Sequence, residues 1–458
     1  MKDRFGCDWT GKRGTPFRGR REIGRRLFFR HAGAAVGGYF LLPSRPMEVV
    51  ARASVSPMGT AKNCILVFLS GGASHTDTFD LKPGPWLPAS FNPTRYNDVL
   101  FPQGLMPLLA EHVPSLAFVR SVRAWAAVHE LARNWIQIAR NPISGTAKIA
   151  PHVGSIVAME LGNQSERRVL PAFVSLNTGS GPGEGYFPPE YGPFRVSPGG
   201  SGLGNTTHRD GAAAFERRYN LLLEIDAESR AGWDEAPEVQ GMAAYNLAAR
   251  MMMYNSDVDR VFTFDQNERV RYGNTAFGNA CVTARNLLRA GMGTRFVQIT
   301  LGGWDNHASI YSALNPANAG SLARQFDTGL GTLISDLKTD GLFDETLIVA
   351  IGEFGRTVGA LNSLAGRDHH LQQAVLMAGA KIRGRRAIGS TDAQGGNTAE
   401  PGWPRDRDIR PEDIDATIYS ALGINWATVR RDDPLGRGFE YIPFAASQDL
   451  YGPVHELW

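Results

Sequence analysis

The sequence predicts an α/β protein with a largely parallel central sheet. Five short apolar runs support this prediction, and the first of them ends in Ser70-Gly71-Gly72, as expected of a buried strand that opens into a loop. The runs are residues 63–69 (NCILVFL), 115–119 (SLAFV), 171–176 (PAFVSL), 294–301 (TRFVQITL) and 345–351 (ETLIVAI). Helical segments alternate with them, and this alternation is typical of a parallel sheet covered on both faces.

Helical spacing predicts helices over residues 104–111, 129–140 and 321–340, and a weaker strand over residues 374–377. Two stretches interrupt the alternation. Residues 179–204 are dense in Gly and Pro and predict a long surface loop. Residues 211–291 have apolar positions at helical spacing and predict a helical insertion between strands.

Composition excludes some classes of protein. The 458 residues are 43% hydrophobic and 20% charged, which indicates a folded globular chain. The formal net charge of +3 comes from the first 53 residues, which hold 12 basic and 4 acidic residues of the totals of 48 and 45. The remaining 36 basic and 41 acidic residues leave a charge of about −5, which gives no electrostatic reason to expect nucleic-acid binding.

The three cysteines do not form a disulfide framework. Cys7 lies in the basic N-terminal segment, Cys64 in an apolar run and Cys281 in a helical stretch. Two buried thiols are the preferred interpretation of the latter two, and a Cys64–Cys281 disulfide is the alternative.

The N-terminal segment has the features of a twin-arginine export signal, in the correct order. Arg25 and Arg26 are followed by LFFR, and residues 32–42 are weakly apolar and too short to span a bilayer stably. Ala51 and Ala53 then supply small residues for a signal peptidase.

We therefore expect a signal peptide over residues 1–53, a single domain over residues 54–458, and a periplasmic or extracellular location. The twin-arginine translocase is the implied partner. The alternatives are a basic tail followed by a first buried helix, and an uncleaved leader that anchors the protein to the membrane.

Polar clusters follow three of the predicted strands. They are residues 71–77 (GGASHTD), 302–307 (GGWDNH) and 352–357 (GEFGRT), and a fourth, residues 366–370 (GRDHH), lies further on. Because ligand sites of such sheets lie at the carboxyl ends of the strands, these clusters are expected to converge. Carboxylates with imidazoles suit zinc, manganese or iron, so the sequence predicts a divalent metal site.

Each cluster alone also has a purely structural interpretation. Asp305 and His307 suit a local turn, and the Asp-His-His cluster that ends at His370 suits a salt-bridge network with Arg367. Arg356 is expected either to hold an anionic group through its planar donors or to pair with a carboxylate such as Glu353. Ser74 is a candidate nucleophile, and the sequence does not show which side chain would act as its general base.

Several of these motifs together resemble a known family. GGASHTDTFD, ERVRYG, GGWDNH, GEFGRT, AGRDHH, IGSTDAQGG and DIDATIYSALGI occur in this order after the leader. The chain resembles the twin-arginine-exported bacterial proteins grouped as domain of unknown function 1501, which look related to the alkaline phosphatase and sulfatase superfamily.

The resemblance implies an alkaline-phosphatase-like α/β/α sandwich with a two-metal site at the strand ends. This chain also departs from the superfamily pattern in several places. Gly-Gly replaces an Asp after the first strand, which displaces any acidic ligand to Asp77, and Glu-Phe-Gly replaces Asp-His-Gly after a late strand. The region of the usual nucleophile offers His129 instead.

The leading hypothesis is a metal-dependent periplasmic hydrolase of phosphate or sulfate esters, with a small anionic ester as substrate. The candidate metal ligands are Asp77, Asp305, His307, Glu353, Asp368, His369 and His370, and the candidate catalytic residues are His75, His129 and Arg356. The alternative is a non-catalytic exported protein that keeps the fold and binds a protein partner. Shared metal binding requires the ligand side chains to lie within about 5 Å of one another.

Overall fold

The structure is a computed structural model that describes residues 55–164, 167–230 and 237–458, so the predicted leader lies outside the described residues. Residues 56–458 form one compact unit. Among the described residues, no helix is both long enough and apolar enough to cross a membrane.

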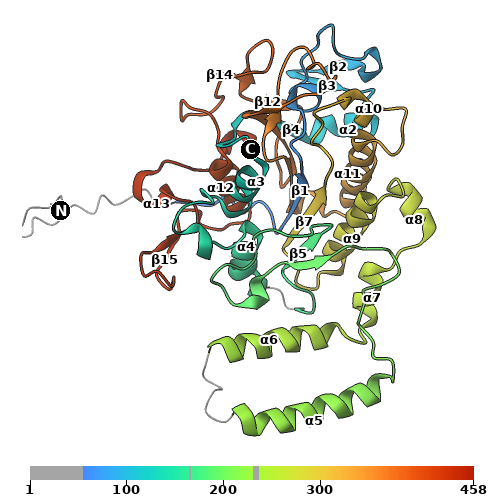
Figure 1. Ribbon diagram of the computed structural model, residues 1–458, viewed down its shortest axis with the longest axis vertical. Coiled ribbons are helices and arrows are strands. Elements are labelled where there is room, and N and C mark those ends of the chain that lie inside the picture. Colours follow the sequence, from blue (N-terminus) through green and yellow to red (C-terminus); the bar gives the residue numbers. More distant parts are fainter. Residues whose placement is uncertain (1–54, 165–166, 231–236) are drawn as a thin grey trace, which may run out of the picture. The chain divides into compact units, whose positions relative to one another are not determined.

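The centre of this unit is an eight-stranded sheet (Figure 1). In spatial order its strands are β12 (Arg386–Ile388), β4 (Leu116–Arg123), β11 (Gln372–Gly379), β8 (Thr346–Ile351), β1 (Asn63–Leu69), β7 (Phe296–Leu301), β5 (Phe173–Leu176) and β6 (Phe194–Val196). β11 is antiparallel to both of its neighbours, and the other pairings are parallel. The predicted largely parallel sheet is confirmed.

Each of the five apolar runs overlaps a strand of this sheet, and β4 extends beyond its predicted run to Arg123. β1 has the predicted bounds, and all seven of its residues are buried because β7 and β8 pair with its two edges and helices cover its faces. The weaker strand at residues 374–377 lies inside the longer β11, whose antiparallel direction the sequence pattern does not reveal. β6 lies inside the segment 179–204 that was predicted to be a loop. The sequence pattern does not reveal this edge strand because three residues are too few to show a strand period.

Helices cover both faces of the sheet. In chain order, the helices of the described residues are α2 (Pro107–His112), α3 (His129–Ile138), α4 (Val153–Leu161), α5 (Ala212–Arg230), α6 (Pro237–Met252), α7 (Ser256–Phe262), α8 (Gln266–Arg271), α9 (Ala276–Ala290), α10 (Ile310–Ala313), α11 (Leu322–Thr339), α12 (Pro411–Ala421) and α13 (Ala445–Gln448). The predicted helical insertion corresponds to α5 to α9. α2 begins later than predicted, at Pro107, because proline is favoured at the first helical position.

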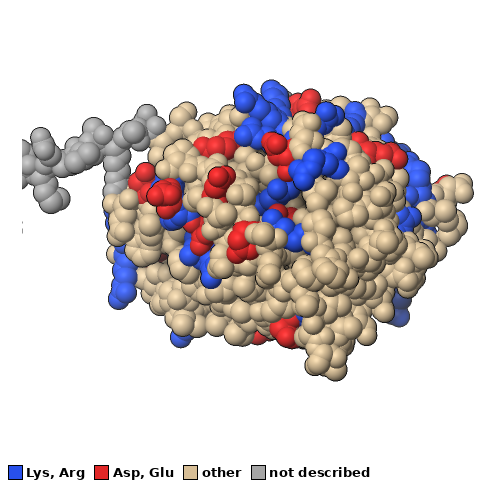
Figure 2. Space-filling view, turned by 90° about the horizontal axis from the view of Figure 1, so that it is seen from above, with Lys and Arg blue, Asp and Glu red and all other residues tan. Residues whose placement is uncertain are grey.

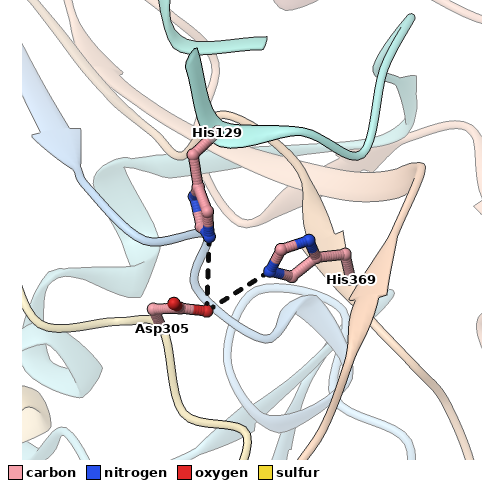
Figure 3. A group of neighbouring side chains, drawn as sticks. All are labelled: His129, Asp305 and His369. Carbon is pink, nitrogen blue, oxygen red and sulfur yellow. Dashed lines mark hydrogen bonds and ion pairs between the residues drawn. The ribbon is translucent and has the colours of Figure 1, made fainter. Parts of the chain in front are cut away.

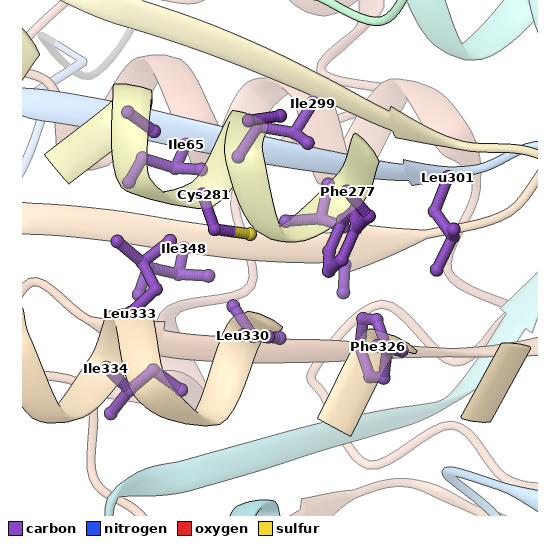
Figure 4. Packing of buried hydrophobic residues seen from close by; sticks show 14 of the residues in the cluster. Ile65, Phe277, Cys281, Ile299, Leu301, Phe326, Leu330, Leu333, Ile334 and Ile348 are labelled. Atoms are coloured by element: carbon purple, nitrogen blue, oxygen red, sulfur yellow. The ribbon is translucent and has the colours of Figure 1, made fainter. Parts of the chain in front are cut away.

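The larger apolar core lies between the sheet and helices α2, α9 and α11. Figure 4 shows Ile65 of β1 and Ile299 of β7 facing Phe277 of α9 and Leu330 of α11. α4 packs on the opposite face, where the ring of His152 stacks on Phe173 of β5. α3 and α12 lie on the same side as α4 (Figure 1).

Small antiparallel pairs complete the fold outside the sheet. β2 (Pro93–Tyr96) pairs with β3 (Val99–Pro102), β13 (Ser390–Thr391) with β14 (Thr398–Glu400), and β15 (Val429–Arg430) with β16 (Phe439–Glu440). Cys64 and Cys281 are both buried and free, so two thiols are present in place of the alternative disulfide. On the face shown in Figure 2, basic and acidic side chains lie among one another instead of forming a continuous basic surface.

α9 and α11 pack closely, so a substitution at their contact tests the packing of the core. A Cβ added at Gly329 of α11 would lie 2.7 Å from the Phe277 ring and 3.3 Å from the sulfur of Cys281. We expect Gly329→Ala to lower the free energy of unfolding by about 1–2 kcal/mol, because overpacking (~1–3 kcal/mol) exceeds the gain in helix propensity (~1 kcal/mol). Gly145→Ala is the matched control, since a Cβ there meets nothing within 4 Å. Urea denaturation measures both variants, and equal stabilities would contradict the expectation.

Candidate metal centre

The loops that leave β1, β7 and β8 meet at one edge of the sheet. β1 is followed by Gly71 and Gly72, β7 by the loop that carries Asp305, and β8 by the turn that carries Glu353. A two-stranded ribbon, β9 (Gly355–Arg356) with β10 (His369–His370), then pairs His369 with Arg356 and joins the third and fourth polar clusters. α3 begins at His129 beside them. The predicted convergence therefore occurs, and His129 joins it.

Three side chains form the centre of this group. His129, Asp305 and His369 each offer one ligand atom, and these atoms lie within 4.8 Å of one another. Asp305 Oδ1 lies 3.4 Å from His129 Nε2 and 3.3 Å from His369 Nε2 (Figure 3). His307 Nε2 extends the group, at 2.9 Å from Asp305 Oδ1 and 3.0 Å from His369 Nε2.

The other nitrogen of each ring faces a hydrogen-bond acceptor. His129 Nδ1 lies 2.8 Å from Glu353 Oε1, His369 Nδ1 lies 2.9 Å from the Ala127 carbonyl, and His307 Nδ1 lies 2.7 Å from Asp368 Oδ1. Each Nδ1 must therefore carry a proton, which leaves the Nε2 atom of a neutral ring as an acceptor.

When the rings are neutral, three Nε2 lone pairs and a carboxylate oxygen thus face one another. His129 Nε2 is buried and has no hydrogen-bond partner. Histidine ligands of metals are held in this way, with the second ring nitrogen donating to a carboxylate or carbonyl. Two imidazoles with a carboxylate suit a divalent transition metal such as zinc, manganese or iron, so the donor set fits the expected group.

Arg356 also contacts Asp305, with Nη2 at 2.6 Å from Asp305 Oδ1. Burial tends to raise the pKa of Asp305, but the hydrogen bond and charge of Arg356 outweigh it and lower this pKa to about 2. Of the two roles expected for Arg356, the contacts correspond to carboxylate pairing. Its partner is Asp305, whereas Glu353 accepts from the backbone N–H of Gly71 at 2.9 Å.

Four residues that the sequence singles out lie away from this group, and they are Ser74, His75, Asp77 and His370. Asp77 is fully buried and forms an ion pair of 2.7 Å with Arg367, which is also fully buried. Ser74 Oγ donates to Asp77 Oδ2 at 2.6 Å, so this hydroxyl belongs to the same buried network. His370 Nε2 lies 2.8 Å from the Gly396 carbonyl.

His75 is buried with Asp77 and stacks on His370, with ring centroids 6.3 Å apart. Its Nε2 lies 2.8 Å from the Gly395 carbonyl. Burial lowers the pKa of His75 to about 4, although the carbonyl opposes this effect. These contacts give His75 a structural role outside the group formed by His129, Asp305 and His369.

A buried carboxylate that is absent from the sequence-based site predictions holds the segment that leads to His129. Glu412, on α12, accepts the indole N–H of Trp125 at 2.9 Å and that of Trp135 at 2.7 Å. Trp135 lies on α3, and Trp125 lies two residues before the Ala127 carbonyl that orients His369. Glu412 lies in the first turn of α12, and only the three-dimensional contact distinguishes it from a solvated acidic residue at a helix start.

The chain matches one family model, described as protein of unknown function (DUF1501), over residues 61–439. It belongs to this family. The match begins after the predicted leader and ends in β16, so it includes every residue of the centre. No protein in the curated set matches the chain in sequence.

Several solved structures are similar to the chain at low identity. They include the lipoteichoic acid synthase LtaP from Listeria monocytogenes, at 10% identity and a TM-score of 0.38 over 80% of this chain and 74% of that one. A protein in the alkaline phosphatase superfamily from Vibrio parahaemolyticus has 13% identity and a TM-score of 0.38 over 81% and 69%. The C-terminal periplasmic domain of EcEptC from Escherichia coli, in a complex with Zn, has 11% identity and a TM-score of 0.36 over 81% and 84%.

The buried Asp77–Arg367 pair leads to a stability prediction. Asp77→Asn leaves the guanidinium of Arg367 buried without a counter-charge, so we expect the free energy of unfolding to fall by about 3–5 kcal/mol. Glu345→Gln, in the exposed pair with Lys62, is the control and should cost less than about 1 kcal/mol. Urea denaturation measures both. If Asp77→Asn lowers the free energy of unfolding no more than the control does, the buried pair does not stabilise the fold as expected.

Glu412 gives a pH prediction. Burial raises its pKa to about 7, although the two indole hydrogen bonds oppose this effect. Because the folded-state pKa is raised above the unfolded value of about 4.3, the folded state keeps the proton longer, and stability is lost as the pH rises from about 4.3 to about 7. Glu412→Gln keeps an acceptor for the indoles and cannot ionise. Its stability relative to the natural protein should therefore rise by roughly 2–3 kcal/mol between pH 5 and pH 8. A difference that is constant across this range in urea denaturation would contradict the raised pKa.

Proposed function

We propose that the protein is a metal-dependent hydrolase of phosphate or sulfate esters that works outside the cytoplasm. The observation that carries the proposal is the convergence of three imidazole Nε2 atoms on Asp305 Oδ1 while acceptors hold each Nδ1 proton. Without a cation this arrangement brings lone pairs together, so the energetics of the site favour a bound divalent metal.

His129, Asp305 and His369 would hold the ion. A divalent metal bound there would supply a Lewis acid that polarises an ester oxygen and lowers the pKa of water. Glu353 holds the His129 ring in the ligating orientation, and the Ala127 carbonyl does the same for His369. Arg356 keeps Asp305 ionised and adds a fixed positive charge that favours an anionic substrate over a neutral one.

His307 is the side chain we assign to proton transfer. It lies at the open side of the centre, where its side chain is 43% exposed, and Asp368 accepts its Nδ1 proton at 2.7 Å. An imidazole held by a carboxylate is suited to give a proton to a leaving oxygen and to take one from water. Asp305, 46% exposed, marks the same side of the centre as the entrance for an ester.

The extracytoplasmic location rests on the leader, whose residues lie outside the described part of the chain. The twin-arginine route moves folded proteins, so it would allow the metal to be inserted before export.

Metal content and ester turnover test this proposal together. We expect the purified protein to bind a transition metal, and His129→Ala and His369→Ala each to weaken the affinity at least 100-fold, because each removes a ligand. His307→Gln should keep the metal and lower kcat for aryl phosphate or aryl sulfate at least 100-fold, with a changed pH profile. His208→Gln is the control, since His208 has the same side-chain exposure as His129, 31%, and lies outside the centre.

Two outcomes would contradict the proposal in different ways. Less than about half an equivalent of metal after soaking, with no turnover, would remove both the metal and the hydrolase. Tight metal binding that depends on His129 and His369, with no turnover in a broad ester screen, would leave the metal centre and favour the exported binding protein.

A further inference from the structure

We infer that the centre takes a single divalent cation, because the guanidinium of Arg356 occupies the place beside Asp305 that a second metal ion would need. The inference rests on the proposed metal site and concerns how many ions it holds. It departs from the two-metal arrangement that the family resemblance implies.

The Arg356 side chain is fully buried, and its donors all have acceptors within the protein. Nε donates to the Gly72 carbonyl at 2.9 Å, and Nη1 donates to the Arg367 carbonyl at 3.1 Å with His307 Nε2 at 3.5 Å. Nη2 donates to Asp305 Oδ1 and to the Gly71 carbonyl. A guanidinium whose N–H groups all have acceptors is held in one position, and its positive charge is held there with it.

These acceptors are also the oxygen ligands that a second cation would use. Two-metal sites hold their ions about 3.5–4 Å apart. Here Nη2 lies 2.6 Å from the same Asp305 oxygen that faces the two ligating imidazoles at 3.3 and 3.4 Å. A second ion bound to Asp305 Oδ1 would overlap the guanidinium, and its charge would repel an ion anywhere beside this carboxylate. Moving Arg356 aside would leave a buried charge unpaired, which is strongly unfavourable.

The backbone after β1 is shaped to hold this guanidinium. Gly71 has φ +111°, and a Cβ there would lie 2.4 Å from the backbone nitrogen of Asp305. Gly72 has φ +78°, and a Cβ there would lie 2.9 Å from the Phe354 carbonyl. No side chain, and hence no carboxylate ligand, can stand at either position. The end of β1 therefore offers the centre two carbonyls, and both accept from Arg356.

The number of ions bound at saturation tests the inference. The full chain is freed of metal and titrated with Zn²⁺ and, separately, with Mn²⁺, and bound metal is counted by elemental analysis. We expect saturation at one equivalent and an uncoupled Mn²⁺ electron paramagnetic resonance spectrum. Two equivalents, or the spectrum of a coupled pair, would overturn the inference and leave the proposed function standing. No binding at all would overturn the proposed metal site itself.

A variant tests whether the guanidinium is the excluding group. Arg356→Ala frees three carbonyls and Asp305, an oxygen-rich set that suits a hard cation, so we expect its Mn²⁺ saturation to rise from one equivalent to two. Arg140→Ala is the control, because Arg140 is also buried and bonded to backbone carbonyls but lies outside the centre, and it should stay at one equivalent. A folded Arg356→Ala protein that still saturates at one equivalent would overturn the role of the guanidinium. If that variant does not fold, the count on the natural protein decides the matter.

Discussion

The site is organised around one oxygen, Asp305 Oδ1, which faces three imidazole nitrogens and a buried guanidinium. Bringing these groups together requires the strand ends of a parallel sheet, because the side chains lie far apart in the sequence. The contact with Arg356 keeps the carboxylate ionised, and the acceptors at each Nδ1 hold the imidazoles with Nε2 towards it.

A buried polar layer holds this arrangement in place. Glu353, the Ala127 carbonyl and Glu412 each receive hydrogen bonds from the segments that carry the ligands. The Asp77–Arg367 pair lies in the same part of the fold, where the Arg367 carbonyl accepts from Arg356. Polar groups with so many satisfied contacts limit the motion of the rings, which favours a site with a defined geometry.

The sequence predicted the convergence of Asp305, His307 and Glu353 because they follow strands of a parallel sheet, whose ends share an edge. It added His369 from a polar cluster further along the chain. It could not divide these residues between metal ligands and the groups that orient them, since a hydrogen bond to Nδ1 or Nε2 leaves no trace in residue spacing. Asp77 shows the same limit: an acidic residue after the first strand has the same local pattern whether it binds a metal or pairs with Arg367. The sequence also could not show that β11 is antiparallel to its neighbours, because an apolar run has the same pattern in a parallel and in an antiparallel strand.

The two-residue ribbon formed by β9 and β10 has a consequence for how this chain can vary. His369 and His370 point to opposite sides of the ribbon, one towards Asp305 and the other towards the Gly396 carbonyl. A slip of one residue in this short pairing would exchange them and carry the ligating ring out of the centre. Insertions or deletions between Thr357 and Asp368 are thus tolerable only where the surrounding loop absorbs them without moving the ribbon. The length of this loop, and not only the identity of its histidines, is therefore part of what defines the site.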